Sequence, residues 1–188
     1  MGIFSGLKDT KAAGGQRDPV ARPGRYLCRV DSFKLQNSQK PPKKPLVVAE
    51  FTIVHVLDEN TGLAHPVGHE SVELILSYGP GEAMFLPKVQ GFLKGVLNQD
   101  ADDDDAESAS SSDEPLKGII VEMSAATKPY KCKKTGETKM ACNRVWHRSL
   151  SKSEAETTLT AEEKTRFFRN GLVENPFAPD EQTAEQNA

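Results

Sequence analysis

Basic side chains gather in three stretches of the chain, and two of these stretches contain residues typical of loops. Segment 38–44 (SQKPPKK) carries its lysines around two prolines that disfavour regular structure, and segment 128–148 carries seven bases against one acid. A third group lies along 22–34. Clustered cations of this kind neutralise phosphates and release their counterions. The bases that we predict to contact a nucleic-acid backbone are Arg25, Arg29, Lys40, Lys43, Lys44, Lys131, Lys133, Lys134, Lys139, Arg144 and Arg148.

Aromatic side chains accompany the second basic stretch. Tyr130 and Trp146 are the candidate stacking platforms there, and Phe33 is a further candidate nearer the N-terminus. Exposed aromatic faces stack on unpaired bases at about 1–3 kcal/mol per base, so the pattern favours a single strand over a duplex. Phe33 fits a core better, Trp146 fits a core equally well, and Tyr130 favours exposure beside its proline and lysines. The lysine run also fits a solvated hairpin tip.

Acidic residues are concentrated elsewhere, in two stretches of low hydrophobicity. Residues 100–114 (DADDDDAESASSSDE) carry eight acids and no base, and residues 174–188 carry four more acids. Such compositions cannot bury enough apolar surface to offset the entropy of ordering, so both are predicted to be disordered. Because they hold twelve of the 27 acids and none of the 24 bases, the rest of the chain has a formal charge of +9, although the whole chain has −3.

The length of 188 residues suits one domain with a modest core, which argues against a two-domain enzyme. We predict a flexible arm at 1–24, a domain at 25–170 with a disordered insert at 99–115, and a disordered tail at 171–188. No apolar run has the length of a membrane span or the character of a secretory signal, and three cysteines suit reduced thiols. These features predict a cytoplasmic protein without a membrane partner.

Alternation of apolar and polar residues indicates strands in five places. The predicted strands are 25–35, 46–57, 70–78, 116–125 and 139–148. In the first of them the apolar parity changes before Phe33, which indicates a bulge. The last two flank a basic hairpin whose turn is predicted at 134–137.

Two other segments follow a helical pattern. Apolar residues recur every three or four positions over 82–97. Near the C-terminus, Thr160 and Glu163 form a capping-box pattern that predicts a short helix at 161–169. We expect the two phenylalanines of this second helix to pack against the sheet.

Three strands, a helix and two strands follow one another in the order of the oligonucleotide-binding (OB) fold. The predicted fold is therefore mainly β: a five-stranded OB-type Greek-key barrel with a helix between strands three and four and a short C-terminal helix. In this fold the loops between strands one and two and between strands four and five contact nucleic acid. The lysine-rich segments 38–44 and 128–139 fall in these two loops, so the charge coincides with the predicted binding loops.

Several features of the chain occur together: this element order, the opening GRYLCRVDSF, the acidic serine-rich insert and the acidic end. In this combination, over about residues 20–150, the chain resembles small phage-encoded single-stranded-DNA-binding proteins with an OB fold. The resemblance implies single-stranded DNA as a partner, and replication or recombination proteins as partners of the acidic segments. Proteins of that class often end in an acidic tail that closes on an aromatic residue, whereas this chain ends in EQNA, with Phe177 eleven residues earlier.

Other kinds of site find little support in the sequence. The residues between His65 and His69 oppose a helix that would bring both rings to one metal, and the spacing of Cys132 and Cys142 is not that of a zinc knuckle. The sequence has no Walker-type, GxSxG or HExxH motif. We predict neither catalysis nor a metal or cofactor, with an unrecognised hydrolase as the alternative.

These observations together predict a non-enzymatic, sequence-independent single-stranded-DNA-binding protein that protects DNA in phage-type replication or recombination. The alternative is a protein-binding adaptor or virion component on the same barrel, and a duplex-DNA or RNA binder is a further one. Edge strands of a small barrel can pair between protomers, which is compatible with a homodimer.

Overall fold

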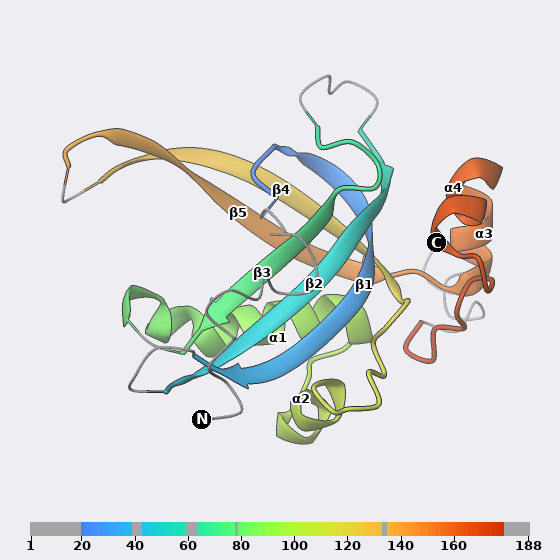
Figure 1. Ribbon diagram of the computed structural model, residues 1–188, viewed down its shortest axis with the longest axis horizontal. Coiled ribbons are helices and arrows are strands. Elements are labelled where there is room, and N and C mark those ends of the chain that lie inside the picture. Colours follow the sequence, from blue (N-terminus) through green and yellow to red (C-terminus); the bar gives the residue numbers. More distant parts are fainter. Residues whose placement is uncertain (1–19, 39–42, 59–63, 78, 133–134, 179–188) are drawn as a thin grey trace, which may run out of the picture.

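The computed structural model describes residues 20–38, 43–58, 64–77, 79–132 and 135–178 (Figure 1). A five-stranded antiparallel sheet forms its centre, with the strand order β3-β2-β1-β4-β5. The strands are β1 (Gly24–Asn37), β2 (Pro45–Val56), β3 (Glu70–Leu76), β4 (Ile120–Lys131) and β5 (Thr138–Ser149). The five predicted strands are confirmed, and the main difference is that β4 starts and ends later than predicted.

The bulge predicted in the first strand is also confirmed. The pairing of β1 with β2 shifts register between Leu27 and Cys28, and again between Val30 and Ser32. A bulge changes which side chains point inward. Cys28, Val30 and Phe33 consequently all face the same core, although their spacing does not alternate regularly.

The sheet curls, but it does not close into the predicted barrel. β3 and β5 are its edges, and no backbone pairing joins them within the described residues. Helix α1 (Phe85–Leu97), preceded by the 3-10 helix η1 (Gly79–Met84), packs against β5 and β3 instead. Phe92 of α1 stacks on Phe33 with ring centroids 5.1 Å apart and meets Trp146 edge-on at 4.9 Å. The predicted amphipathic helix is thus present, and its side chains help to fill the opening of the sheet.

A glycine allows α1 to lie directly against β5. A Cβ atom built on Gly95 would lie 2.7 Å from the Cβ atom of Trp146 and 3.0 Å from its carbonyl carbon. A Cβ atom on Gly91, one turn earlier, would meet no atom of the described residues within 4 Å. Only Gly95 is therefore required by the packing of this helix.

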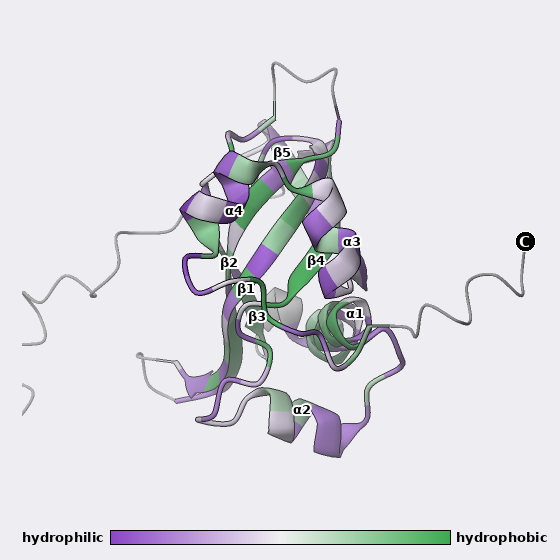
Figure 2. Cartoon of the chain, turned by 90° about the vertical axis from the view of Figure 1, so that its right-hand side faces the viewer, coloured by the Kyte–Doolittle hydropathy of each residue, from purple (hydrophilic) through white to green (hydrophobic). Residues whose placement is uncertain are grey.

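Two short helices cover one end of the sheet. These are α3 (Lys152–Thr158) and α4 (Ala161–Phe167), and Figure 2 shows apolar strand segments between them. Leu27, Val54 and Phe168 belong to a second apolar cluster under these helices. Among the described residues, no helix has both the length and the apolar character needed to cross a membrane.

The capping box predicted for the C-terminal helix is confirmed. The Glu163 backbone N–H donates to Thr160 Oγ1 at 3.2 Å, and the Thr160 backbone N–H donates to a Glu163 carboxylate oxygen at 2.9 Å. Helix α3 begins with the same box between Ser151 and Glu154, which the sequence analysis did not identify. The capping-box residues are present in the sequence, but a helix of seven residues is too short to show a clear repeat of apolar residues.

The acidic insert differs from the prediction that it is disordered. Residues Asp103–Ala109 form helix α2, which begins with a capping box between Asp102 and Asp105. Ala109 and Leu116 are 3% and 2% exposed and belong to the main core, although α2 is largely hydrophilic (Figure 2). Composition misled the prediction because acids near a helix N-terminus are stabilising and because single apolar residues anchor the segment.

The predicted arm and tail are also described in part. Val20 is fully buried, and β1 already begins at Gly24, so the end of the predicted N-terminal arm belongs to the domain. In the predicted tail, the Asn175 amide donates to Ser149 Oγ at 2.8 Å and to the Leu150 carbonyl at 2.9 Å. Residues 1–19 and 179–188 lie outside the described residues.

Candidate nucleic-acid interface

The outer part of the β4–β5 hairpin projects beyond the sheet (Figure 1). We call residues 126–131 and 138–143 the arm, and their side chains are exposed or partly exposed. Tyr130 lies opposite Lys139 in the pairing, and Lys128 lies opposite Ala141. Directly opposed residues of antiparallel strands point to the same face, as do residues two apart on one strand. Lys128, Tyr130 and Lys139 therefore share one face of the arm.

Tyr130 is the exposed aromatic residue of this face, with 48% of its surface accessible. Lys128 precedes it by two residues on the same strand, and Lys139 stands across from it. A ring with cations on two sides can stack on a base while the ammonium groups approach the neighbouring phosphates. Lys131 is exposed as well, on the opposite face of the arm.

The lysines of the arm differ from other lysines of the protein in their lack of acidic partners. Elsewhere, Lys34, Lys94, Lys117 and Lys152 each have a carboxylate within 4.0 Å. Within the described ranges, no carboxylate forms an ion pair with Lys128, Lys131 or Lys139. Cations without internal partners keep a positive potential around the arm that an anionic ligand can neutralise.

The β1–β2 connection supplies two more exposed lysines, Lys43 and Lys44. The Ser38 backbone N–H donates to the Lys44 carbonyl at 2.8 Å, and the Lys44 N–H donates to Ser38 Oγ at 3.0 Å, so these bonds close the base of the loop. In Figure 1 the end of β1 and the start of β2 lie at the lower left, and the outer part of the β4–β5 hairpin lies at the upper left. Lys40, Lys133 and Lys134 lie outside the described residues.

A groove of about 600 Å³ lies where the arm joins the sheet. It brings together Arg25 and Arg148, two predicted contacts, and adds Lys94, which the sequence analysis did not identify. Arg25 Nη2 donates to Glu122 Oε1 at 2.6 Å, and this hydrogen bond raises the pKa of Arg25. Arg148 forms an ion pair with Glu154 at 2.7 Å. These exposed pairs contribute little to stability, so phosphates can replace their carboxylates.

The groove and the face of the arm belong to one continuous side of β4. Ser124 lines the groove and lies an even number of residues before Lys128 and Tyr130. Because side chains alternate along a strand, all three point to the same side. Ser124 Oγ is hydrogen-bonded to His147 Nε2 at 2.8 Å, which places the imidazole on this side too.

Trp146 lies in the core, so its predicted role as a stacking platform is not supported. It is 9% exposed, and its ring meets Phe51 and Phe92 edge to face, with centroids 5.0 and 4.9 Å away. Its Nε1 donates to Glu73 Oε2 at 3.2 Å. A ring enclosed in this way has no open face for a base. Phe33 is 3% exposed and is likewise a core residue, in agreement with its alternative interpretation.

Two predicted phosphate contacts instead have internal partners. Arg144 Nε lies 3.4 Å from the buried Glu73 carboxylate, and the Arg144 side chain is only 12% exposed. Arg29 pairs with Asp31 at 2.8 Å, and its Nη1 donates to the Phe167 carbonyl at 2.6 Å. Arg144 therefore links the two open edges of the sheet, and Arg29 attaches α4 to β1. We leave both out of the interface on the arm.

The site therefore consists of the arm, the groove at its root and the β1–β2 connection. Its charge was predictable from sequence, whereas the grouping of Arg25, Lys94 and Arg148 depends on the position of α1 against β5. No protein-family model matches the sequence, and no curated protein gives a significant match.

Proposed function

We propose that this protein binds single-stranded DNA without catalysis and without sequence preference, and that it protects this DNA in phage-type replication or recombination. The observation that carries the proposal is the arm, where the exposed Tyr130 shares a face with Lys128 and Lys139. Stability of the sheet does not require an exposed ring and cations without acidic partners at this place. Stacking on the ring and release of counterions from the phosphates explain both features.

We interpret the sheet as an open form of the OB-type barrel. That fold is five-stranded and partly open, and it binds oligonucleotides with the loops between strands one and two and between strands four and five. The arm and the connection with Lys43 and Lys44 occupy these two positions in the chain. Glu73 bridges the open edges through Arg144 and Trp146 at the place where backbone pairing would close a barrel.

The proposed role includes protein partners and a compartment. The resemblance to phage single-stranded-DNA-binding proteins favours replication or recombination proteins as partners of the acidic segments. Helix α2 carries Asp103, Asp104 and Glu107 on its exposed surface, where a basic partner can approach them. A phage-encoded protein of this kind acts in the host cytoplasm.

A titration with a labelled single strand of about 16 nucleotides, the upper site size for one OB domain, tests the proposal. Binding is measured between about 50 and 200 mM salt, because log K falls with log salt by about 0.7 for each phosphate contact. Removing two contacts with Lys128→Ala and Lys139→Ala, on the face of Tyr130, should lower this slope by about 1.4. The matched control is Lys152→Ala with Lys164→Ala, which removes the same charge from α3 and α4.

The outcomes separate the proposed function from its alternatives. Tight binding that resists duplex and RNA competitors, with a lower slope only in the arm variant, supports the proposal. Preference for duplex or RNA would reassign the ligand. Absence of binding at the lowest salt, or an equal loss in both variants, would overturn the proposal and favour a protein-binding adaptor.

A further inference from the structure

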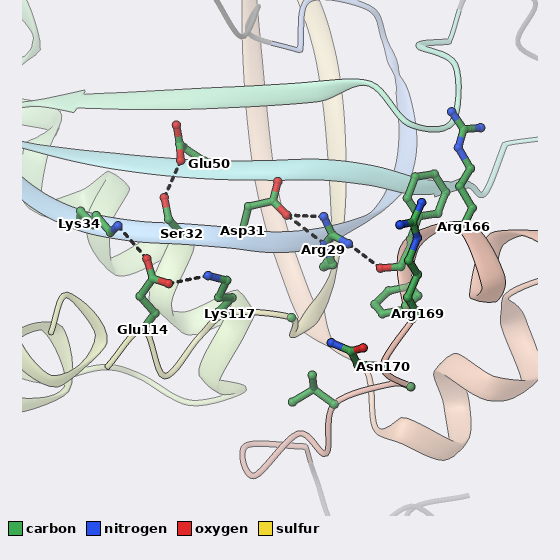
Figure 3. A pocket seen from close by; sticks show the side chains of 15 residues that line it. Arg29, Asp31, Ser32, Lys34, Glu50, Glu114, Lys117, Arg166, Arg169 and Asn170 are labelled. Atoms are coloured by element: carbon green, nitrogen blue, oxygen red, sulfur yellow. Dashed lines mark hydrogen bonds and ion pairs between the residues drawn. The ribbon is translucent and has the colours of Figure 1, made fainter. Parts of the chain in front are cut away.

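A second groove, of about 790 Å³, lies on the outer side of β1 (Figure 3). Residues of α4 line it, and in Figure 1 this helix lies at the opposite end of the molecule from the arm. At one end Lys34 and Lys117 converge on Glu114, and at the other Arg166 and Arg169 project from the end of α4 and the residues after it. Its volume is within the usual range of ligand sites. Neither arginine is among the nucleic-acid contacts predicted from the sequence.

The acids that line this groove are engaged by its own residues. Asp31 binds Arg29 at 2.8 Å and accepts a hydrogen bond from Thr52, and Glu50 accepts one from Ser32 at 2.8 Å. Five bases and three acids line the groove, so its net charge is positive.

Glu114 occupies the lysine end of the groove. It binds both Lys34 and Lys117 at 2.7 Å, and the hydrogen bonds from Lys117 and Lys34 lower its pKa to about 2. Both lysines remain 46% and 62% exposed. A phosphate can therefore reach these ammonium groups on the side that Glu114 leaves open.

Arg166 and Arg169 carry the free charge at the other end. Among the described residues, neither is within ion-pair distance of a carboxylate, and both are exposed. The Arg166 guanidinium carbon lies over the Phe167 ring, 5.0 Å from the ring centroid, in a cation–π contact. A planar guanidinium held in this way can bind a phosphate through two parallel hydrogen bonds.

One side of β1 connects this groove with the β1–β2 loop. Ser32 and Lys34 line the groove, Gln36 follows at the same spacing, and no register shift occurs after Ser32. These side chains therefore point to one side of the strand and lead towards Lys43 and Lys44. From Lys34 to Arg29 the strand spans about 17 Å, a length of several nucleotides.

We propose that this groove is an extension of the single-strand path, in which Arg166, Arg169 and Lys117 bind the phosphates of nucleotides that continue beyond the β1–β2 loop. The inference rests on the proposed function. It makes α4 and the segment after it, which lie outside the five-stranded arrangement, part of the binding surface. It also predicts that the protein contacts a longer strand than the arm alone can cover.

The experiment compares oligothymidylates of about 6 and about 16 nucleotides, the lower and upper parts of the range for one OB domain. Arg166→Ala with Arg169→Ala should lower the salt slope for the longer strand by about 1.4 and leave the shorter strand unchanged. The control is again Lys152→Ala with Lys164→Ala, on α3 and α4 but outside the lining of the groove. Circular dichroism and thermal unfolding verify that both variants are folded.

The arm variant Lys128→Ala with Lys139→Ala separates failure of the two proposals. If the arm variant weakens binding of both oligonucleotides while the arginine variant weakens binding of neither, the groove is not a subsite and only the proposed extension is overturned. An equal effect of the arginine variant on both lengths would also overturn it. If the arm variant affects neither strand, the proposed function itself fails.

Discussion

The β4–β5 hairpin consists of a buried root and an exposed arm, although one pair of strands forms both. In the root, Met123 pairs with Trp146, and both belong to the core. In the arm, Tyr130 pairs with Lys139, and both are exposed. An aromatic residue thus stands on β4 or β5 in each half, with opposite burial. The alternating sequence pattern predicts where the hairpin lies. Which half of the hairpin is buried depends on the elements that pack against it.

The opposing elements of the root are α1 and β3. Gly95 brings the helix against the backbone of Trp146, and Glu73 accepts a hydrogen bond from the indole. No helix of the described chain covers the arm, which extends past the end of α1 in Figure 1. The root is therefore determined by packing, and the arm is free to serve as a ligand surface.

The strongest test of this comparison replaces the two aromatic residues. Trp146→Ala should lower the free energy of unfolding by about 3–5 kcal/mol, because it leaves a cavity between Phe51 and Phe92. Tyr130→Ala should change it by less than about 0.5 kcal/mol, because the ring packs on no core. The Tyr130 variant should instead weaken binding of a single strand by about 1–3 kcal/mol. Urea denaturation and the oligonucleotide titration measure the two effects.

Conservative variants test whether the Tyr130 ring stacks on bases and whether the Trp146 ring fills the core. Tyr130→Phe keeps the stacking face and should bind as the unmodified protein does. Trp146→Phe keeps an aromatic ring in the core but loses the hydrogen bond to Glu73, so its cost should be smaller than that of alanine. Similar losses of stability in the two alanine variants would contradict the division into root and arm.

A smaller effect is expected from the two glycines of α1. Gly95→Ala should destabilise the protein by about 1–3 kcal/mol, because its Cβ would overlap Trp146. Gly91→Ala should stabilise it by up to about 1 kcal/mol, because alanine favours a helix and the site has open space. Thermal unfolding of the two variants separates the effect of the contact with β5 from the effect of helix propensity. Stabilisation by both substitutions would show that α1 does not determine the root.

The sequence predicted the features that depend on local pattern. Strands, bulge and capping box are local, and the exposure of Tyr130 follows from its lysine-rich neighbourhood. The contacts that removed Arg29 and Trp146 from the predicted interface join residues 138 and 73 positions apart in the chain. Charge alone does not reveal such distant partners. Helix α2 escaped prediction because average composition conceals a capping residue and one buried alanine.

The smallest predicted effect concerns lysines with and without a partner. In contrast to the arm lysines, Lys34 and Lys117 share Glu114, whose pKa in the folded protein is about 2 against a usual value of 4.5. A carboxyl whose pKa is lowered by folding contributes stability above its unfolded pKa and loses it as the pH falls. Unfolding measured from pH 7 to pH 2 should thus show a stability difference between unmodified protein and Glu114→Gln that is constant above about pH 5 and disappears towards pH 2. The same substitution in a Lys34→Ala, Lys117→Ala background should show almost no difference, and an undiminished one would mean that these ion pairs are not the cause.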